Sequence, residues 1–152
     1  MTTTDPVVDQ ANPLDQFLCF SVYAAGLAFN RVYKPLLDRY GITYPQYLAI
    51  VALSGRDGQK VSELGDTLFL ESNTLTPLIK RLEAAGLVSR TRDTQDERVV
   101  RVSLTDQGHK VAQDALACVP GDVLRATGMS GEDLAKLNTA MSQLGGALRK
   151  AG

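Results

Sequence analysis

Two cysteines, Cys19 and Cys118, are the most chemically reactive side chains of this 152-residue chain. A cysteine reacts with oxidants as the thiolate, so a reactive cysteine needs neighbours that stabilise negative charge on sulfur. Residues 1–15 carry no basic segment followed by a continuous apolar stretch, so we expect no secretory signal and a cytoplasmic protein. Thiols are kept reduced there, which favours a redox or structural role over a permanent disulfide. Most free cysteines are small buried hydrophobes, and for Cys19 this alternative stays open.

A second group of side chains has the chemistry of a nucleic-acid interface. Within 73–85, Leu75, Leu78, Ile79 and Leu82 recur at the spacing of one apolar helix face. Short polar side chains on the opposite face can reach base edges, and basic ones can hold phosphates. On an isolated helix such a face is more often simply solvated. The side chains concerned are Asn73, Thr74, Thr76, Pro77, Lys80 and Arg81.

The elements around this helix favour the DNA-binding interpretation. A short helix is predicted over 61–68 and a tight turn over 69–71, with Ser72 as the N-cap of the longer helix and Gly86 as its end. Short helix, tight turn and longer helix make a helix-turn-helix, in which the second helix enters the major groove.

Two strands, 87–91 and 99–104, should follow as a hairpin with a polar, charged tip over 92–97. Arg98 could enter a minor groove, where negative potential attracts a guanidinium group, and Asp96 could orient it. A hairpin in this place completes a winged helix-turn-helix.

The formal net charge of −1 by itself argues against a nucleic-acid binder. The charge is unevenly distributed, however, because basic side chains gather in the predicted helix and hairpin while acidic ones are scattered. A basic face on a nearly neutral protein can still bind phosphates. Its residues are Lys80, Arg81, Arg90, Arg92, Arg98 and Arg101.

The remaining segments read as helices of a single domain. Asn12-Pro13 should open an apolar helix over 14–32, followed by a short helical piece over 34–39 and another helix over 43–53. The hydrophobic content of 44% and charged content of 22% are ordinary for a soluble globular protein, and no apolar stretch is long enough to span a membrane.

Two more helices are predicted after the hairpin. One should begin at Thr105 and run to about Val119, where Pro120-Gly121 breaks it. The last should be capped by Ser130 with Asp133, and its apolar stripe has the spacing that fits a partner helix. The stripe consists of Leu134, Leu137, Met141, Leu144 and Leu148.

From about Leu14 to Leu148 the chain resembles the MarR family of regulators, most clearly over 82–88 (LEAAGLV), 96–98 (DER) and 104–108 (LTDQG). Within that family, 74–83 (TLTPLIKRLE) and 14–20 (LDQFLCF) resemble the OhrR subgroup of organic hydroperoxide sensors.

The resemblance implies a mainly helical fold with a small β-hairpin wing. It implies one domain over 1–152, in which helices in 14–40 and 105–150 form a homodimer and 43–104 forms the winged helix-turn-helix lobe. It further implies a repressor of a peroxide-detoxifying gene. This repressor would bind a pseudo-palindromic DNA operator and release it when an organic hydroperoxide oxidises Cys19.

Tyr33 and Tyr44 match, by spacing, the two tyrosines that contact the sensing cysteine in the OhrR subgroup. Their hydroxyl groups could stabilise a thiolate by hydrogen bonding. Tyr33 follows Cys19 by fourteen positions, about 21 Å along one helix, so contact requires a sharp reversal or a tyrosine from the other subunit. Cys118 lies roughly where members with two cysteines carry a resolving thiol, which makes a Cys19–Cys118 disulfide between subunits one candidate outcome and an inert core residue the other.

Other chemistry finds little support in the sequence. The single histidine, His109, has no Cys, Asp or Glu set at ligand spacing, so we expect a surface position and neither a metal site nor a cofactor. One alternative is a regulator released by a small aromatic ligand that binds between the dimerisation helices and the DNA-binding lobes. Another is a thiol peroxidase with Cys118 as resolving thiol, but an enzyme of this kind would leave the winged helix unexplained.

Overall fold

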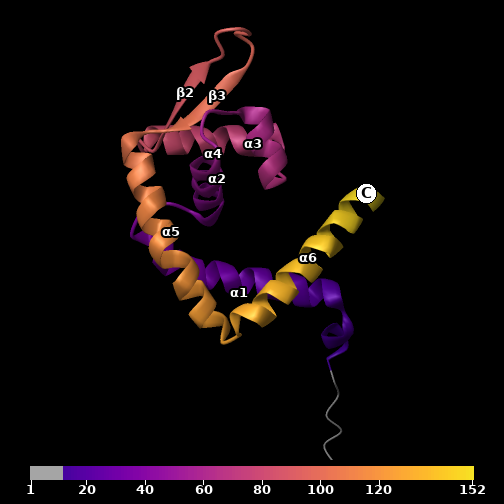
Figure 1. Ribbon diagram of the computed structural model, residues 1–152. Coiled ribbons are helices and arrows are strands. Elements are labelled where there is room, and N and C mark those ends of the chain that lie inside the picture. Colours follow the sequence, from indigo (N-terminus) through magenta and orange to yellow (C-terminus); the bar gives the residue numbers. More distant parts are fainter. Residues whose placement is uncertain (1–11) are drawn as a thin grey trace, which may run out of the picture.

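The computed structural model describes residues 12–152. A 3-10 helix, Pro13–Gln16, precedes α1, and the helices and the short sheet of the lobe follow in the order that Figure 1 traces along the chain. The bounds are α1 Leu18–Asp38, α2 Tyr44–Gly55, β1 Gln59–Lys60, α3 Val61–Leu68, α4 Ser72–Ala84, β2 Val88–Arg92, β3 Val100–Leu104, α5 Asp106–Thr127 and α6 Gly131–Ala151.

The first helix differs from its prediction at both ends. Pro13 opens only the 3-10 turn, with the Asn12 side chain accepting from the Leu14 N–H, and α1 then starts at Leu18. The predicted pieces over 14–32 and 34–39 form one helix that continues through Pro35. Pro35 is exposed, so water can solvate the carbonyl that its ring leaves without a donor, while Leu37 beyond it is buried in the core.

The lobe between α1 and α5 is a winged helix-turn-helix, as predicted. Its antiparallel sheet has the order β1-β3-β2, with Val88 paired to Leu104 and Gln59 paired to Val102. Strand β1 was not predicted, because it has only two residues. Gln59 is buried there because its side-chain amide donates to the carbonyls of Ala52 and Arg56, at 3.0 and 2.7 Å, at the end of α2.

Helix α4 begins one residue earlier than expected. Ser72 is its first residue rather than its N-cap; Glu71 holds the cap position without a side-chain hydrogen bond. The predicted end at Gly86 is confirmed: its φ is +78°, the Gly86 N–H donates to the Glu83 carbonyl, and the Leu87 N–H donates to the Leu82 carbonyl. This pair of bonds turns the chain directly from α4 into β2.

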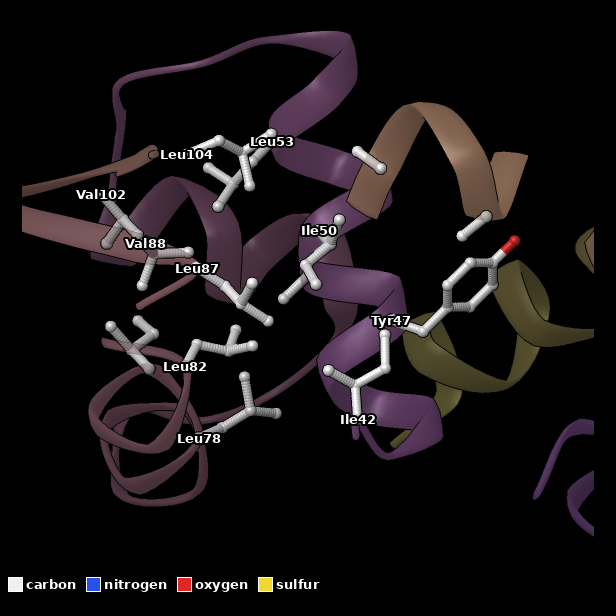
Figure 2. Close-up of a cluster of buried hydrophobic side chains, with 14 of the residues drawn as sticks. Ile42, Tyr47, Ile50, Leu53, Leu78, Leu82, Leu87, Val88, Val102 and Leu104 are labelled. Carbon is white, nitrogen blue, oxygen red and sulfur yellow. The ribbon is translucent and has the colours of Figure 1, made fainter. Parts of the chain in front are cut away.

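The core of the lobe joins α2, α4 and the sheet, as Figure 2 shows. The apolar face predicted for α4 is buried against α2 and the first residues of β2, which holds the polar face of α4 outward. The labelled core residues of Figure 2 are Ile42, Tyr47, Ile50, Leu53, Leu78, Leu82, Leu87, Val88, Val102 and Leu104.

Helix α5 is longer than predicted, because it passes through Pro120-Gly121 and ends at Thr127. Pro120 is exposed while Val119 and Val123 are buried, so packing beyond the proline keeps the chain helical. The first turn is anchored to the lobe: the Thr105 side chain accepts from the Gly108 N–H at 3.1 Å and donates to the Gly86 carbonyl at 2.6 Å. In Figure 1, α5 runs from the lobe down to α1.

The terminal helices expose much apolar surface in the single chain. Helix α6 begins at the predicted Ser130 cap and, within the described residues, makes only isolated contacts with the rest of the chain. One contact places the Arg149 guanidinium 3.9 Å from the ring centre of Phe69, in the turn between α3 and α4. No helix among residues 12–152 is both long and apolar enough to cross a membrane. Exposed apolar side chains of α1 and α6 include Leu18, Val22, Leu27, Phe29, Leu137, Met141 and Leu148.

Candidate nucleic-acid interface and thiol site

The predicted base-reading face of α4 is accessible. Ser72, Asn73 and Thr74 occupy its exposed first turn, where the Thr74 hydroxyl lies 3.5 Å from the Asn73 side-chain oxygen. Thr76 is half-buried and Pro77 is exposed. Because proline has no N–H, the backbone carbonyl of Asn73 has no helical donor and is available to other partners.

The basic residues of α4 lie further along the same face. Lys80 and Arg81 are both exposed, and neither forms an ion pair with an acidic side chain of residues 12–152. Their positive charges are therefore exposed and not balanced by an ion pair among the described residues.

The tip of the hairpin presents Arg98. Its side chain is 90% exposed, and its Nε donates to the Asp96 carboxylate at 3.1 Å. The Arg98 backbone N–H donates to the same oxygen at 3.1 Å, and these two interactions hold the pKa of Asp96 below its usual range. The charged Asp96 carboxylate thus restrains the backbone and the Nε of Arg98, whose side chain projects into solvent at the end of the hairpin.

A cavity of about 310 Å³ lies between the hairpin and the helix-turn-helix. We call it the wing groove. Lys60 and Ser62, at the start of α3, face Arg90 and Arg98 across it, and the sequence analysis assigned neither Lys60 nor Ser62 to the interface. The available signal was that Lys60 and Ser62 flank Val61, the first residue of the short helix. The lining consists of Lys60, Val61, Ser62, Thr76, Ile79, Arg90, Arg98, Val99 and Val100.

The arginines of the predicted basic face other than Arg81 have partners within the chain: Arg98 pairs with Asp96, Arg92 donates to the Glu97 carbonyl, and Arg90 and Arg101 link elements of the lobe. Arg90 donates to Glu83 through Nε and NH2, at 3.2 and 2.9 Å, which lowers the pKa of Glu83 and ties β2 to α4. Arg101 donates to Asp93 at 2.8 Å and to the Gly58 carbonyl at 3.0 Å, which joins both strands of the hairpin to the turn before β1. Arg101 therefore braces the wing, and its charge is largely balanced by Asp93.

Cys19 is the second residue of α1 and its side chain is exposed. The helix was expected to begin at residue 14, so its actual start places Cys19 in the first turn. Phe17 and Phe20, on either side, are exposed and half-buried respectively. The site thus combines an accessible thiol with apolar neighbours.

Tyr33 and Tyr44 lie together rather than beside Cys19 of the same chain. Their ring centres are 4.5 Å apart, and Tyr47 of α2 lies 5.9 Å from Tyr33. Since α1 is one continuous helix, Cys19 and Tyr33 are separated by about 21 Å along its axis. Burial, with Tyr44 and Tyr47 nearby, raises the pKa of Tyr33 to about 12, and burial also raises the pKa of Tyr44. Both hydroxyls remain protonated at neutral pH and can act as hydrogen-bond donors.

Cys118 is exposed on α5, one turn after Asp114. The Tyr40 hydroxyl donates to the Asp114 carboxylate at 2.5 Å, and this bond is the main reason that the pKa of Tyr40 is raised to about 12; burial, the Asp114 charge and Cys118 add to the effect. Cys118 is accessible, so it is not buried in the core of the single chain.

His109 lies at the surface, where its Nε2 is 3.3 Å from the Asp57 carboxylate. The other oxygen of that carboxylate accepts from the Leu104 N–H at 2.9 Å, so Asp57 and His109 help to fasten the start of α5 to the turn before β1. No group of three or more potential metal-ligating side chains occurs between residues 12 and 152.

Comparison with known proteins gives this geometry a context. Residues 31–115 match a family described as transcriptional regulator SarA/Rot. The organic hydroperoxide resistance transcriptional regulator of Bacillus subtilis is 44% identical over 86% of this chain and 88% of its own length. The HTH-type transcriptional regulator TtmR of Methylorubrum extorquens is 49% identical over 80% of this chain, which spans 62% of that longer protein.

Among solved structures, reduced AbfR bound to DNA superimposes with a TM-score of 0.76 at 32% identity, covering 88% of this chain and 90% of AbfR. AbfR has also been solved in an overoxidized form bound to DNA and in a disulfide form.

Proposed function

Because the chain belongs to the MarR family of transcriptional regulators, we propose that it is a cytoplasmic repressor that binds operator DNA as a homodimer and releases it when an organic hydroperoxide oxidises Cys19. The observation that carries the redox part is the exposed Cys19 thiol at the N-terminus of α1, on a helix that also carries Tyr33. The name of the Bacillus subtilis relative supports the same class of oxidant.

The lobe would bind DNA through two grooves. The first turn of α4, with Ser72, Asn73 and Thr74, would enter the major groove, where Thr76 and Pro77 would lie against it and Lys80 and Arg81 would hold phosphates. Arg98, supported by Asp96, would enter the neighbouring minor groove. A two-fold pair of lobes would read a pseudo-palindromic operator with half-sites about one helical turn, roughly 34 Å, apart.

The two-fold partner would also complete the thiol site. The continuous α1 keeps Cys19 and Tyr33 of one chain apart, so the Tyr33 and Tyr44 hydroxyls that donate to the thiolate would belong to the other subunit. The exposed apolar side chains of α1 and α6 supply the surface for this association.

Oxidation would transfer one oxygen atom to sulfur. The Cys19 thiolate attacks the terminal oxygen of the hydroperoxide, the O–O bond breaks, and sulfur is oxidised by two electrons to a sulfenic acid while the peroxide is reduced and leaves as an alcohol after taking a proton. The Cys118 thiol of the other subunit could then form a disulfide and release water. A small cellular thiol could form a mixed disulfide instead. In either case Cys19 reacts once for each signal, as a sensor rather than an enzyme.

The decisive experiment measures operator release by the wild-type protein. Reduced protein bound to a labelled operator should dissociate on addition of cumene hydroperoxide and rebind after dithiothreitol, and non-reducing gels should show whether a cross-linked dimer accompanies release. Release by an unreactive phenolic acid, unchanged by reductant, would instead identify a ligand-responsive regulator. Retention of DNA under both treatments would contradict the proposal.

Arg98→Ala should weaken operator binding by about 1–3 kcal/mol, because the guanidinium that would occupy the minor groove is removed. Fluorescence anisotropy with labelled operator would measure the change. Arg125→Ala removes an equal charge from the far end of α5 and should leave the affinity nearly unchanged.

Asp96→Asn is an independent test, because two explanations predict opposite changes in its affinity for the operator. It removes a negative charge beside DNA, so charge alone predicts tighter binding, whereas loss of the support for Arg98 predicts weaker binding. We expect weaker binding. Tighter binding by Asp96→Asn would contradict the supporting role of Asp96, and unchanged binding by Arg98→Ala would contradict a wing that contacts DNA.

A further inference from the structure

Tyr47 is a third tyrosine at the Tyr33–Tyr44 pair, and neither the sequence analysis nor the proposed function uses it. It follows Tyr44 by three positions on α2, so the two side chains share one face of the helix. The ring centre of Tyr47 lies 6.4 Å from Tyr44 and 5.9 Å from Tyr33. Each of the three rings therefore contacts the other two, in the range of favourable aromatic pairs.

The three rings differ in burial. Tyr47 is only 5% exposed and belongs to the core, whereas Tyr33 and Tyr44 are half-buried around it. In Figure 2 the ring of Tyr47 lies at one end of the core cluster, and its hydroxyl points away from the leucines. A ring packed in the core has one fixed position, so it can hold the two outer rings in theirs.

We propose that Tyr47 is a positioning residue that holds the Tyr33 and Tyr44 rings in the orientation from which their hydroxyls stabilise the sensing thiolate. This inference rests on the proposed function, because it assumes that Tyr33 and Tyr44 meet the thiolate of Cys19. Without the Tyr47 ring, both outer rings lose a packing partner and gain alternative rotamers. Their hydroxyl groups then spend less time aimed at sulfur.

The consequence is a change in the pH dependence of oxidation. Hydrogen bonds to a thiolate favour the charged form, and the reaction rate follows the thiolate fraction. Weaker hydrogen bonds should therefore move the midpoint of the rate profile to higher pH. A merely structural loss would change the melting temperature without moving this midpoint.

The test follows sulfenic acid formation at Cys19 with cumene hydroperoxide, as a function of pH, in a Cys118→Ser background. Tyr47→Leu should raise the midpoint by about one pH unit and slow oxidation about tenfold at pH values below it. Tyr47→Phe keeps the ring and should retain the wild-type profile. Ile50→Val, a buried change on the same helix, should lower the melting temperature without moving the midpoint. If Tyr47→Leu does not fold, Tyr47→Met takes its place, because its unbranched side chain adapts better to an irregular space.

Two further variants separate this inference from the proposed function. Tyr33→Phe and Tyr44→Phe each remove a donor hydroxyl and should raise the midpoint. If they do so while Tyr47→Leu leaves the profile unchanged, the positioning role is wrong and the thiol site stands. If Tyr47→Phe shifts the profile as much as Tyr47→Leu, the hydroxyl acts and the packing proposal is wrong. If neither Tyr33→Phe nor Tyr44→Phe has an effect, the tyrosine part of the proposed function fails as well.

Discussion

Cys19→Ser protein should remain on its operator at peroxide concentrations that release the wild type completely. Serine is close to cysteine in size, and Cys19 is exposed in the first turn of α1, at the opposite end of that helix from α2, so the affinity of the reduced state for DNA should be preserved. The hydroxyl of serine neither ionises near neutral pH nor accepts oxygen from a peroxide, so the switch has no chemical trigger. Gel-shift titrations with and without cumene hydroperoxide measure both properties.

Cys118→Ser is the matched control, since it removes the other exposed thiol. It should still release DNA, through a sulfenic acid or a mixed disulfide at Cys19, although no disulfide between the two cysteines can form. If Cys19→Ser protein released DNA at the peroxide concentrations that release the wild type, another group would be the sensor.

Gly108→Ala should lower the free energy of unfolding by about 3 kcal/mol, and the melting temperature by roughly 10 °C. A Cβ at this position would lie 2.0 Å from the Leu87 carbonyl oxygen and 3.2 Å from Leu104 Cδ2. The carbonyl is backbone and already accepts from the Thr105 N–H at 3.0 Å, so it cannot move aside without breaking the connection between the lobe and α5.

Gly121→Ala, in the same helix, is the control for glycine replacement itself. The nearest atom to its Cβ is the flexible Arg125 guanidinium at 3.6 Å, an ordinary contact. Helix propensity should make this change neutral or stabilising by up to about 1 kcal/mol. Thermal denaturation followed by circular dichroism compares the two variants, and equal stability of Gly108→Ala and wild type would contradict the close approach of α5 to the Leu87 backbone.

Much of the fold follows from local patterns in the sequence. The apolar spacing of Leu75, Leu78, Ile79 and Leu82 located α4 and its buried face, and the structure confirms both. Gly86 ended that helix as predicted, because its left-handed conformation is one that glycine adopts at little cost.

The errors arose where tertiary packing overrides local preference. Pro120 was expected to end a helix, and α1 was expected as two pieces, 14–32 and 34–39. Pro35 and Pro120 both lie on exposed faces, and buried residues beyond them keep α1 and α5 helical. The two-residue strand β1 is too short to show alternation, and its position depends on the Gln59 side chain capping α2.

The candidate sites were predictable to different degrees. The polar face of α4 could be found from one helix, since it is the complement of an apolar face. The hydrogen bonds of Arg101 to Asp93 and to the Gly58 carbonyl could not be predicted, because Gly58 is distant from Arg101 in the sequence. Tyr47 was hidden for a similar reason: spacing in sequence does not reveal that α1 and α2 bring three aromatic rings together.

The sparse packing of α6 within its own chain links folding to protein abundance. Under the proposed two-fold association, the partner's helices would cover the apolar side chains that α6 exposes in the single chain, so the stability of α6 would grow with the concentration of the chain. Newly made molecules at very low copy number would have a folded lobe but no stable C-terminal helix. The cellular concentration of such a regulator would therefore set two quantities: the fraction of molecules with a folded α6, and the occupancy of the operators by those molecules.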